Sequence, residues 1–414
     1  MAPVGSYASL TAAIQGGADS VYFGIGKLNM RSNSSQNFTL DDLKEITRIC
    51  REHNIRTYIT LNTVIYDHEL EEMKKIVEAA KVNGISALIA SDWSVITYAR
   101  SKGMEVHMST QTNITNLEAV KYYAQYADVM VTARELQLEQ VKAITTAIRE
   151  QNITGPSGNL VQIEIFAHGA LCMAVSGKCY LSLDNLNSSA NRGACLQPCR
   201  RKYIVKDKES DLELEIDGEY IMSPKDLNMV SFLDKILDAG VRVLKLEGRG
   251  RSPEYVKTVA AVYREAVNAW FDGNYTQQRI DEWNERLATV YNRGFWDGYY
   301  LGKKLGEWTE SYGNQATIRK MYIGKVTNYF SKIGVAELKI ETHDLAVDEE
   351  IKIVGPTTGV YEDTISEIRL DYDPVEKAVK GDICSIPVKE LVRRGDKVYK
   401  MVPADKNIPN LVQQ

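Results

Sequence analysis

The chain up to Leu246 alternates short apolar runs with longer amphipathic segments, and this alternation restricts the folds open to it. Short apolar runs are typical of buried strands, and segments with apolar residues every three or four positions are typical of the helices that cover them. A helix is expected from Leu40 to His53, with Thr39 as its N-cap. A second helix is expected from Glu69 to Asn83, and Gly84 ends it. The strands are expected at Ala2–Val4, Ser20–Gly24, Thr57–Leu61, Ala87–Ala90, Glu105–Ser109, Val129–Thr132, Gln162–Phe166 and Val243–Leu246.

Eight strands, most of them followed by a helix, predict an α/β fold of the (β/α)8 TIM-barrel type. An open doubly wound sheet is the alternative, but no Gly-x-Gly-x-x-Gly pattern follows the first strand, which weakens it. The barrel is expected to span residues 1–272, with an insertion at 169–242 between its last two strands. Barrels of this type carry their active sites at the carboxyl ends of the strands, so the insertion begins where a substrate would bind.

The rest of the chain has a different pattern. Residues 273–315 are expected to form a helical connector. From 316 to 402 apolar and polar residues alternate in short runs separated by Gly and Asp, which predicts a small closed β-barrel, and 403–414 are expected to be a tail. No apolar stretch approaches the roughly 20 residues of a membrane helix. The net charge of -5 argues against a surface that binds nucleic acid everywhere.

Four of the six cysteines lie close together in the insertion, spaced Cys-x6-Cys-x15-Cys-x3-Cys. The start of the chain has neither the basic region nor the apolar run of a signal peptide, so the protein is expected to be cytoplasmic, where clustered thiols usually bind metal. The long x6 and x15 gaps favour an iron–sulfur cluster over zinc, whose structural sites use closer pairs, and disulfides come third. The expected ligands are Cys172, Cys179, Cys195 and Cys199, whereas Cys50 and Cys384 are expected to be buried thiols.

Polar side chains collect where the expected strands end, which is where a barrel places its chemistry. For any single one of them, capping of a helix or contact with solvent is the simpler explanation, and Asp92 and Asn116 are interpreted as caps. The set as a whole is more informative than its members and indicates a site. It comprises Asn62 after the third strand, Gln111 and Asn113 after the fifth, Arg134 and Glu135 after the sixth, His168 after the seventh, and Glu247 and Arg249 after the eighth.

Residues 164–182 resemble the signature of the collagenase-like peptidase family of unknown catalytic type. They read Glu-Ile-Phe-Ala-His-Gly-Ala-Leu-Cys-Met-Ala-Val-Ser-Gly-Lys-Cys-Tyr-Leu-Ser and include the first two clustered cysteines. The resemblance covers nearly the whole chain, because further stretches are similar to motifs of the same family. These stretches are residues 2–6, 107–113, 223–227, 244–249 and 292–295.

Some branches of this family contain an iron–sulfur cluster and act in the hydroxylation of tRNA uridine, ribosomal RNA cytidine or ubiquinone precursors. In some branches the fourth cysteine follows a Lys-Asp-Leu motif, where this chain has Asn228, so the resemblance implies Cys199 as the fourth ligand. That arrangement resembles the tRNA branch, which makes 5-hydroxyuridine at the wobble position with prephenate. The implied cofactor is a 4Fe–4S cluster. A peptidase is one alternative, although the chain has no His-Glu-x-x-His or Gly-x-Ser-x-Gly pattern, and a zinc-stapled binding module without catalysis is the other.

Prephenate has two carboxylates, so a site for it needs fixed cations, and arginine binds a carboxylate through two parallel hydrogen bonds. The expected catalytic group is Glu164, Glu247 and His168, in which the glutamates orient the cations and the histidine transfers a proton or contacts the substrate. An inward-facing ion pair of Lys245 or Glu247, and simple packing of His168, are the alternatives. The expected substrate-binding residues are Lys225, Lys245, Arg249, Gln111, Asn113 and Asn62, with Arg31 as a further candidate, and the expected tRNA contacts are Arg200, Arg201 and Lys202.

Overall fold

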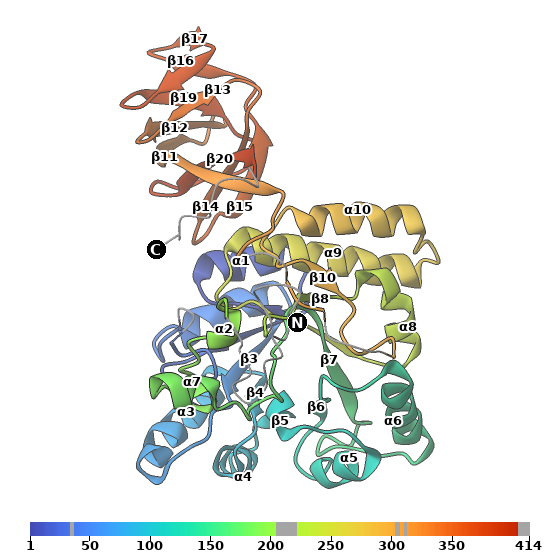
Figure 1. The fold of residues 1–414 in the computed structure, drawn as a ribbon. Coiled ribbons are helices and arrows are strands. Elements are labelled where there is room, and N and C mark those ends of the chain that lie inside the picture. Colours follow the sequence, from blue (N-terminus) through green and yellow to red (C-terminus); the bar gives the residue numbers. More distant parts are fainter. Residues whose placement is uncertain (34–36, 204–221, 303–306, 310–312, 405–414) are drawn as a thin grey trace, which may run out of the picture.

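A mainly parallel sheet covered by helices forms the N-terminal part of the molecule (Figure 1). The computed structural model describes residues 1–33, 37–203, 222–302, 307–309 and 313–404. From β1 to β7 each strand pairs parallel with the next, and β9 pairs parallel with β7, which confirms the predicted α/β arrangement. The bounds are β1 (Ala2–Pro3), β2 (Ser20–Gly24), β3 (Arg56–Leu61), β4 (Ala87–Ala90), β5 (Glu105–Met108), β6 (Val129–Val131), β7 (Gln162–Ala170) and β9 (Val243–Leu246).

The first and last parallel strands are joined by hydrogen bonds at Met1 rather than by a strand ladder. The Met1 amine donates to the carbonyl of Leu244 at 2.9 Å, and the N–H of Leu246 donates to the carbonyl of Met1 at 3.1 Å. The pairing of strands in the described residues therefore does not run continuously from β9 to β1. The expected closed barrel is not found, because these parallel strands form an open path. Strands β2 and β4 are buried at every position, as expected where both faces of a strand are covered.

Helices cover this sheet, and most begin and end where the sequence pattern indicates. Asp92 and Asn116 cap α4 and α5, each accepting a backbone N–H at 2.9 Å, and Gly84 ends α3 with a φ of 72°. The prediction of Thr39 as the N-cap of α2 is wrong, because Asp42 takes that place after closing a turn with the Thr39 hydroxyl at 2.7 Å. The helices are α1 (Tyr7–Gln15), α2 (Leu43–Glu52), α3 (Leu70–Asn83), α4 (Trp93–Ser101), α5 (Leu117–Tyr123), α6 (Leu138–Glu150), α8 (Leu233–Asp238) and α9 (Pro253–Phe271).

The insertion between β7 and β9 adds a short strand to the end of β7. It contains α7 (Leu181–Leu186) and β8 (Asp226–Asn228), and β8 runs antiparallel to β7. After α10 (Gln277–Ala288) the chain returns to place β10 (Phe295–Trp296) parallel to β8. The segment 273–315 was expected as a helical connector; its described residues hold one helix and then extend the N-terminal sheet.

An antiparallel sheet with its own apolar core forms the C-terminal part (orange to red in Figure 1). The period-two pattern correctly predicts antiparallel strands. Their pairing within the described residues follows an open path from β15 to β17, however, so the expected closed barrel is not found. The path consists of β15 (Gly359–Thr364), β14 (Glu350–Gly355), β20 (Lys397–Pro403), β11 (Ile318–Phe330), β12 (Val335–Ile340), β19 (Ile383–Pro387), β16 (Ile368–Leu370) and β17 (Asp373–Val375), and β13 (Asp344–Ala346) pairs separately with β18 (Lys377–Val379).

Strand β15 joins this sheet to the N-terminal part through the backbone of Val360. Its N–H donates to Oε1 of Gln15 on α1 at 3.0 Å, and its carbonyl accepts from Nζ of Lys257 on α9 at 2.8 Å. Of the expected tail, residues 405–414 lie outside the described part of the chain. None of the described helices has the length and apolar character needed to cross a membrane.

A buried ion pair holds β8 and β10 together. Arg293 donates to the same carboxylate oxygen of Asp226 from Nε at 3.0 Å and from Nη2 at 2.8 Å, and both side chains are buried. Two hydrogen bonds to one charged oxygen fix the segment before β10 against β8.

Asp226→Asn is expected to lower the free energy of unfolding by about 3 kcal/mol, because Arg293 would remain buried without a counter-charge. Urea denaturation followed by circular dichroism measures the change. The exposed ion pair of Lys121 with Glu118 on α5 supplies the control, and Lys121→Ala should leave the midpoint unchanged. Equal effects of the two substitutions would contradict a stabilising role for the Asp226–Arg293 pair.

Candidate functional site

A cavity of about 300 Å³ lies at the carboxyl ends of the parallel strands. Strand residues and the residues that follow the strands form one part of its wall, among them Thr60 of β3, Ser109 after β5 and Phe166 of β7. Residues 171–203, here called the cysteine loop, form the other part. The parallel strands and the insertion therefore line one common cavity, as the position of the insertion in the sequence predicts.

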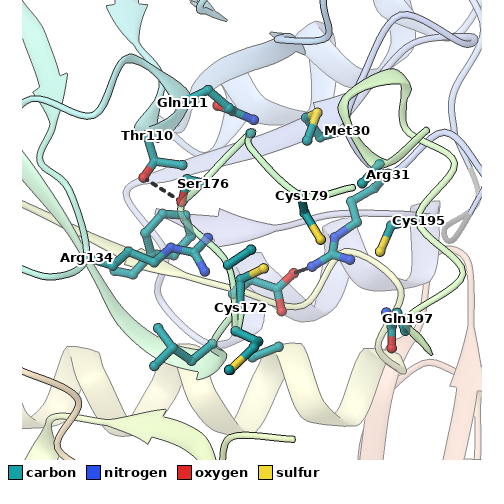
Figure 2. A pocket seen from close by; sticks show the side chains of 18 of the residues that line it. Met30, Arg31, Thr110, Gln111, Arg134, Cys172, Ser176, Cys179, Cys195 and Gln197 are labelled. Carbon is teal, nitrogen blue, oxygen red and sulfur yellow. Dashed lines mark hydrogen bonds and ion pairs between the residues drawn. The ribbon is translucent and has the colours of Figure 1, made fainter. Parts of the chain in front are cut away.

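All four clustered cysteines line this cavity, and none forms a disulfide. Figure 2 shows Cys172, Cys179 and Cys195 directed toward the space that Arg31 also enters. Burial raises the pKa of Cys199, and the nearby Arg200 opposes this shift. The two remaining cysteines, Cys50 and Cys384, are buried elsewhere, as predicted, and burial raises the pKa of both to about 12.

The arrangement of the four thiols limits the kind of metal group that they can bind. Among the described residues, no three histidine, cysteine or carboxylate side chains converge closely enough to bind a single metal ion. A 4Fe–4S cluster places each thiolate on a different iron atom, so its four ligands need not meet at one point. By number, chemistry and their common cavity, the four thiols match the ligand set of such a cluster.

The middle of the cysteine loop is anchored on the loops that follow β2 and β3. Nη1 of Arg192 donates to the carbonyl of Val64 at 2.5 Å and to Glu69 at 2.6 Å, and its guanidinium lies 4.2 Å from the centre of the Tyr66 ring. Gly193 has a φ of 77° and so close an approach to Asn29 that a Cβ atom would lie 2.3 Å from the Asn29 carbonyl oxygen. Only glycine fits at this contact.

Arg200 anchors the end of the cysteine loop. Its guanidinium donates to the carbonyls of Leu171 and Pro224, each at 2.6 Å, and to the hydroxyl of Ser223 at 2.9 Å. Burial lowers the pKa of Arg200 to about 10. The side chain expected to contact tRNA is therefore turned inward to hold the loop, whereas Arg201 and Lys202 are exposed.

The cavity is strongly cationic. One carboxylate, that of Glu247, belongs to its lining, and Arg31 donates to it at 2.9 Å. Burial alone would raise the pKa of Glu247, but the surrounding arginines outweigh this effect and hold it below its ordinary value. An ionised Glu247 cannot balance the positive charge of the wall, to which Arg31, Arg134, Arg200, Lys245, Arg249, Arg251 and Arg293 contribute.

Arg249 is buried in this wall, and the partners found for it are neutral. Nη1 donates to the hydroxyl of Thr60 at 2.9 Å, and Nη2 donates to Oδ1 of Asn29 at 3.0 Å. Burial lowers the pKa of Arg249 to about 10. A guanidinium that is held in place by neutral partners and forms no ion pair is suited to receive an anionic ligand.

Lys245 has a different environment, because it forms a buried ion pair. Its Nζ lies 2.7 Å from Oε1 of Glu164, and the Glu164 side chain is fully buried. The inward-facing pair considered from the sequence is thus present, with Glu164 rather than Glu247 as the partner of Lys245. Glu164 does not line the cavity, and its second carboxylate oxygen has no hydrogen-bond partner in the described structure.

His168 lies behind the cavity wall. It is 1% exposed, and its ring packs near those of Tyr255, Tyr263 and Phe295, with centroids 6.0, 5.6 and 5.6 Å away. Burial lowers its pKa to about 3, so the ring is neutral at ordinary pH. This environment matches the packing alternative better than proton transfer to a ligand in the cavity.

The other predicted site residues divide into two groups. Asn62 and Gln111 line the cavity. Asn113 does not; its side chain donates to the backbone carbonyl of Gln111 at 2.9 Å and so supports the turn that carries Gln111. Lys225 lies outside and pairs with Glu307 at 3.0 Å.

Sequence reasoning missed Asn29, whose role depends on long-range contacts. Its Oδ1 accepts from Arg249 and from the backbone N–H of Arg31 at 3.1 Å, so one fully buried amide orients both arginines. Nothing in the sequence around Asn29 indicates this role. Arg251 and Arg293, which the sequence analysis also left out of the site, follow β9 and α10.

Arg249→Met is expected to leave the free energy of unfolding of the ligand-free protein unchanged within about 1 kcal/mol, or to raise it. The folded state binds the guanidinium proton less tightly than the unfolded state does, so this charge opposes folding at every pH below about 10. Arg293→Met, which removes the partner of Asp226, is the control and should be destabilising in the same urea titration. If the two variants lose equal stability, Arg249 is a structural residue.

The sequence matches the model of peptidase family U32 over residues 5–310. A protein of Porphyromonas gingivalis named collagenase is 58% identical over 400 residues, which cover 97% of each chain. The tRNA hydroxylation protein P1 of Bacillus subtilis is 28% identical over 378 residues, 89% of this chain and 86% of that protein. A 23S rRNA 5-hydroxycytidine synthase of Escherichia coli is 34% identical over 270 residues, 65% of this chain and 39% of that protein. The family model and the match along nearly the full length show that the chain belongs to peptidase family U32.

Proposed function

We propose that this protein is an iron–sulfur-dependent enzyme that hydroxylates a uridine of tRNA at C5, with prephenate or a related dicarboxylate as co-substrate. The observation that carries the proposal is one cavity that combines four thiols with a buried arginine, Arg249, whose hydrogen-bond partners are neutral. Relatives named for tRNA hydroxylation and for rRNA 5-hydroxycytidine synthesis support RNA as the substrate.

Arg249 supplies the first anchor for a carboxylate of the co-substrate. Its guanidinium is held by Thr60 and Asn29 before any ligand arrives, so little ordering is needed on binding. Asn62 and Gln111, which line the same cavity, add uncharged donors and acceptors for the ligand or for the uracil ring. Lys245 contributes positive charge already balanced by Glu164.

The cluster would be held by Cys172, Cys179, Cys195 and Cys199, and when bound it would supply electron transfer next to the cavity. Arginines beside the thiols would offset part of the negative charge of such a cluster, although burial raises the pKa of Cys199 in the free protein. Arg200 lies near Cys199 and opposes the rise of its pKa, and the charge of Cys195 helps to raise the pKa of Arg31, after the larger effect of Glu247. Zinc remains the alternative metal for the same thiols.

RNA would approach the cavity over the cysteine loop. Arg201 and Lys202 are exposed there, and Tyr180 is 73% exposed, so both phosphate contacts and stacking of an unpaired base are available. The net charge of -5 restricts such contacts to a local surface.

Peptide hydrolysis is the second candidate, because the 58% identical relative is named collagenase. A cysteine peptidase needs a histidine within hydrogen-bond reach of its thiol. No histidine lines the cavity in the described residues, and His168, next to the wall in sequence, is buried among aromatic rings. The geometry therefore favours the RNA-modifying function.

Cys199→Ser is expected to remove the broad visible absorption of anaerobically purified protein and most of its iron. Cys384→Ser, in the core of the C-terminal sheet, is the matched control and should keep both. Iron and zinc are measured on the same samples. One zinc per chain with no iron in the anaerobic wild-type protein would refute the cluster.

Deleting the gene, together with any paralogue, is expected to remove 5-hydroxyuridine from tRNA, as measured by mass spectrometry of nucleosides. Complementation with wild type should restore it, whereas Arg249→Met and Cys199→Ser should not. Unchanged 5-hydroxyuridine in the deletion strain would reject the assignment. Cleavage of gelatin by purified protein in which all four clustered cysteines are serine would then favour the peptidase.

A further inference from the structure

Arg134, which follows β6, is a second arginine in the cavity wall that forms no ion pair with a carboxylate in the described structure. Within the described residues its side chain makes no hydrogen bond or ion pair, and its Nε is buried without a partner. Buried donors in folded proteins are nearly always satisfied, and a bound ligand is one source of the missing acceptor. Arg251, also in the wall, differs in having no buried nitrogen without a partner.

An aromatic ring, rather than a carboxylate, positions Arg134. Its guanidinium lies 4.2 Å from the centre of the Phe166 ring on the neighbouring strand β7. Stacking of this kind fixes the plane of the guanidinium and leaves its N–H groups at the edge available. Figure 2 shows Arg134 and Arg31 entering the cavity from opposite sides of the view.

Arg249 belongs to a different wall from Arg134. It is tied to Thr60 of β3 and to Asn29 after β2, whereas Arg134 follows β6 and rests on β7. Glu247 forms an ion pair with Arg31 and, at longer range, also attracts Arg134 and Arg249. Within the described residues the cavity thus offers two guanidinium groups, Arg134 and Arg249, that form no ion pair with a carboxylate.

We propose that Arg134 and Arg249 bind the two acid groups of one small dianionic ligand, and that Arg134 is the residue that selects a dicarboxylate over a monocarboxylate. This inference rests on the proposed function only in taking prephenate as the first ligand to test. It adds a residue and a specificity rule to that function.

The size of the site favours a small molecule over RNA phosphates. Arg249 is 6% exposed, and the cavity measures about 300 Å³, a size that suits a small molecule better than a continuous phosphodiester chain. Phosphate contacts in RNA complexes are made mainly by exposed cations, a description that fits Arg201 and Lys202. A ligand with one acid group would leave one arginine uncompensated.

Isothermal titration of the full-length, anaerobically purified protein without RNA tests this inference. The probes are prephenate and its monocarboxylate counterpart phenylpyruvate, followed by glutarate and butyrate. Wild type should bind the dicarboxylate of a pair about 30-fold more tightly or better, which is the lower range for a charged contact in a buried site. Arg134→Gln should reduce this ratio to near one, and Arg134→Lys should restore only part of it, because lysine lacks the planar fork.

Arg149→Gln is the matched control, since Arg149 is exposed at the end of α6 in the same β/α unit. It should keep the wild-type ratio. Thermal unfolding of each variant separates loss of the fold from loss of binding, and Arg134→Lys preserves the charge if Arg134→Gln does not fold.

The outcomes separate this inference from the proposed function. An unchanged ratio in Arg134→Gln, no preference for dicarboxylates in wild type, or tighter Arg134-dependent binding of inorganic phosphate or a short RNA would each overturn the inference. An Arg134-dependent preference for glutarate without binding of prephenate would support it while refuting prephenate as co-substrate.

Discussion

Parallel pairing of the strands puts all their carboxyl ends at the same edge of the sheet, and the site depends on this constraint. Thr60, Ser109, Arg134 and Glu247 come from four β/α units, yet they line one cavity because their strands run in the same direction. The short strand β8 and its partner β10 extend the sheet where the insertion leaves β7. They fix the position of Pro224, which precedes β8, and Arg200 of the cysteine loop donates a hydrogen bond to the Pro224 carbonyl.

The positive charge of the cavity lowers the stability of the free protein and favours the binding of an anion. Taking a guanidinium out of water is unfavourable unless a carboxylate or several acceptors compensate it. Arg293 and Lys245 are compensated by Asp226 and Glu164, whereas Arg249 is held by neutral groups alone. Such uncompensated charge is characteristic of functional sites, where a ligand completes the charge balance and the free protein is less stable than it would otherwise be.

Local patterns in the sequence predicted the elements well, but they did not predict the partners of individual side chains. Apolar runs located all eight parallel strands, and the dense cysteines located the cavity wall. Both patterns could be recognised because each is contained in a short stretch of the sequence. The ion pair of Lys245 with Glu164 joins residues 81 positions apart, and the two bonds of Asn29 depend on three-dimensional placement. The position of a residue after a predicted strand also does not show where its side chain lies. The side chain of Arg249 faces the cavity, whereas that of His168 lies behind the wall. The prediction of closed barrels was wrong for a related reason, because closure depends on hydrogen bonds between edge strands that are distant in the sequence.

The anchors of the cysteine loop have a consequence for the order in which the protein matures. Arg192 reaches Glu69, 123 positions earlier in the chain, and Val64, 128 positions earlier. Contacts between such distant residues form late in folding, because the intervening chain must first be arranged. The cysteine loop is therefore expected to reach its final position after the strands beneath it have paired, and a metal group bound by its thiols, as proposed, would be completed at that stage.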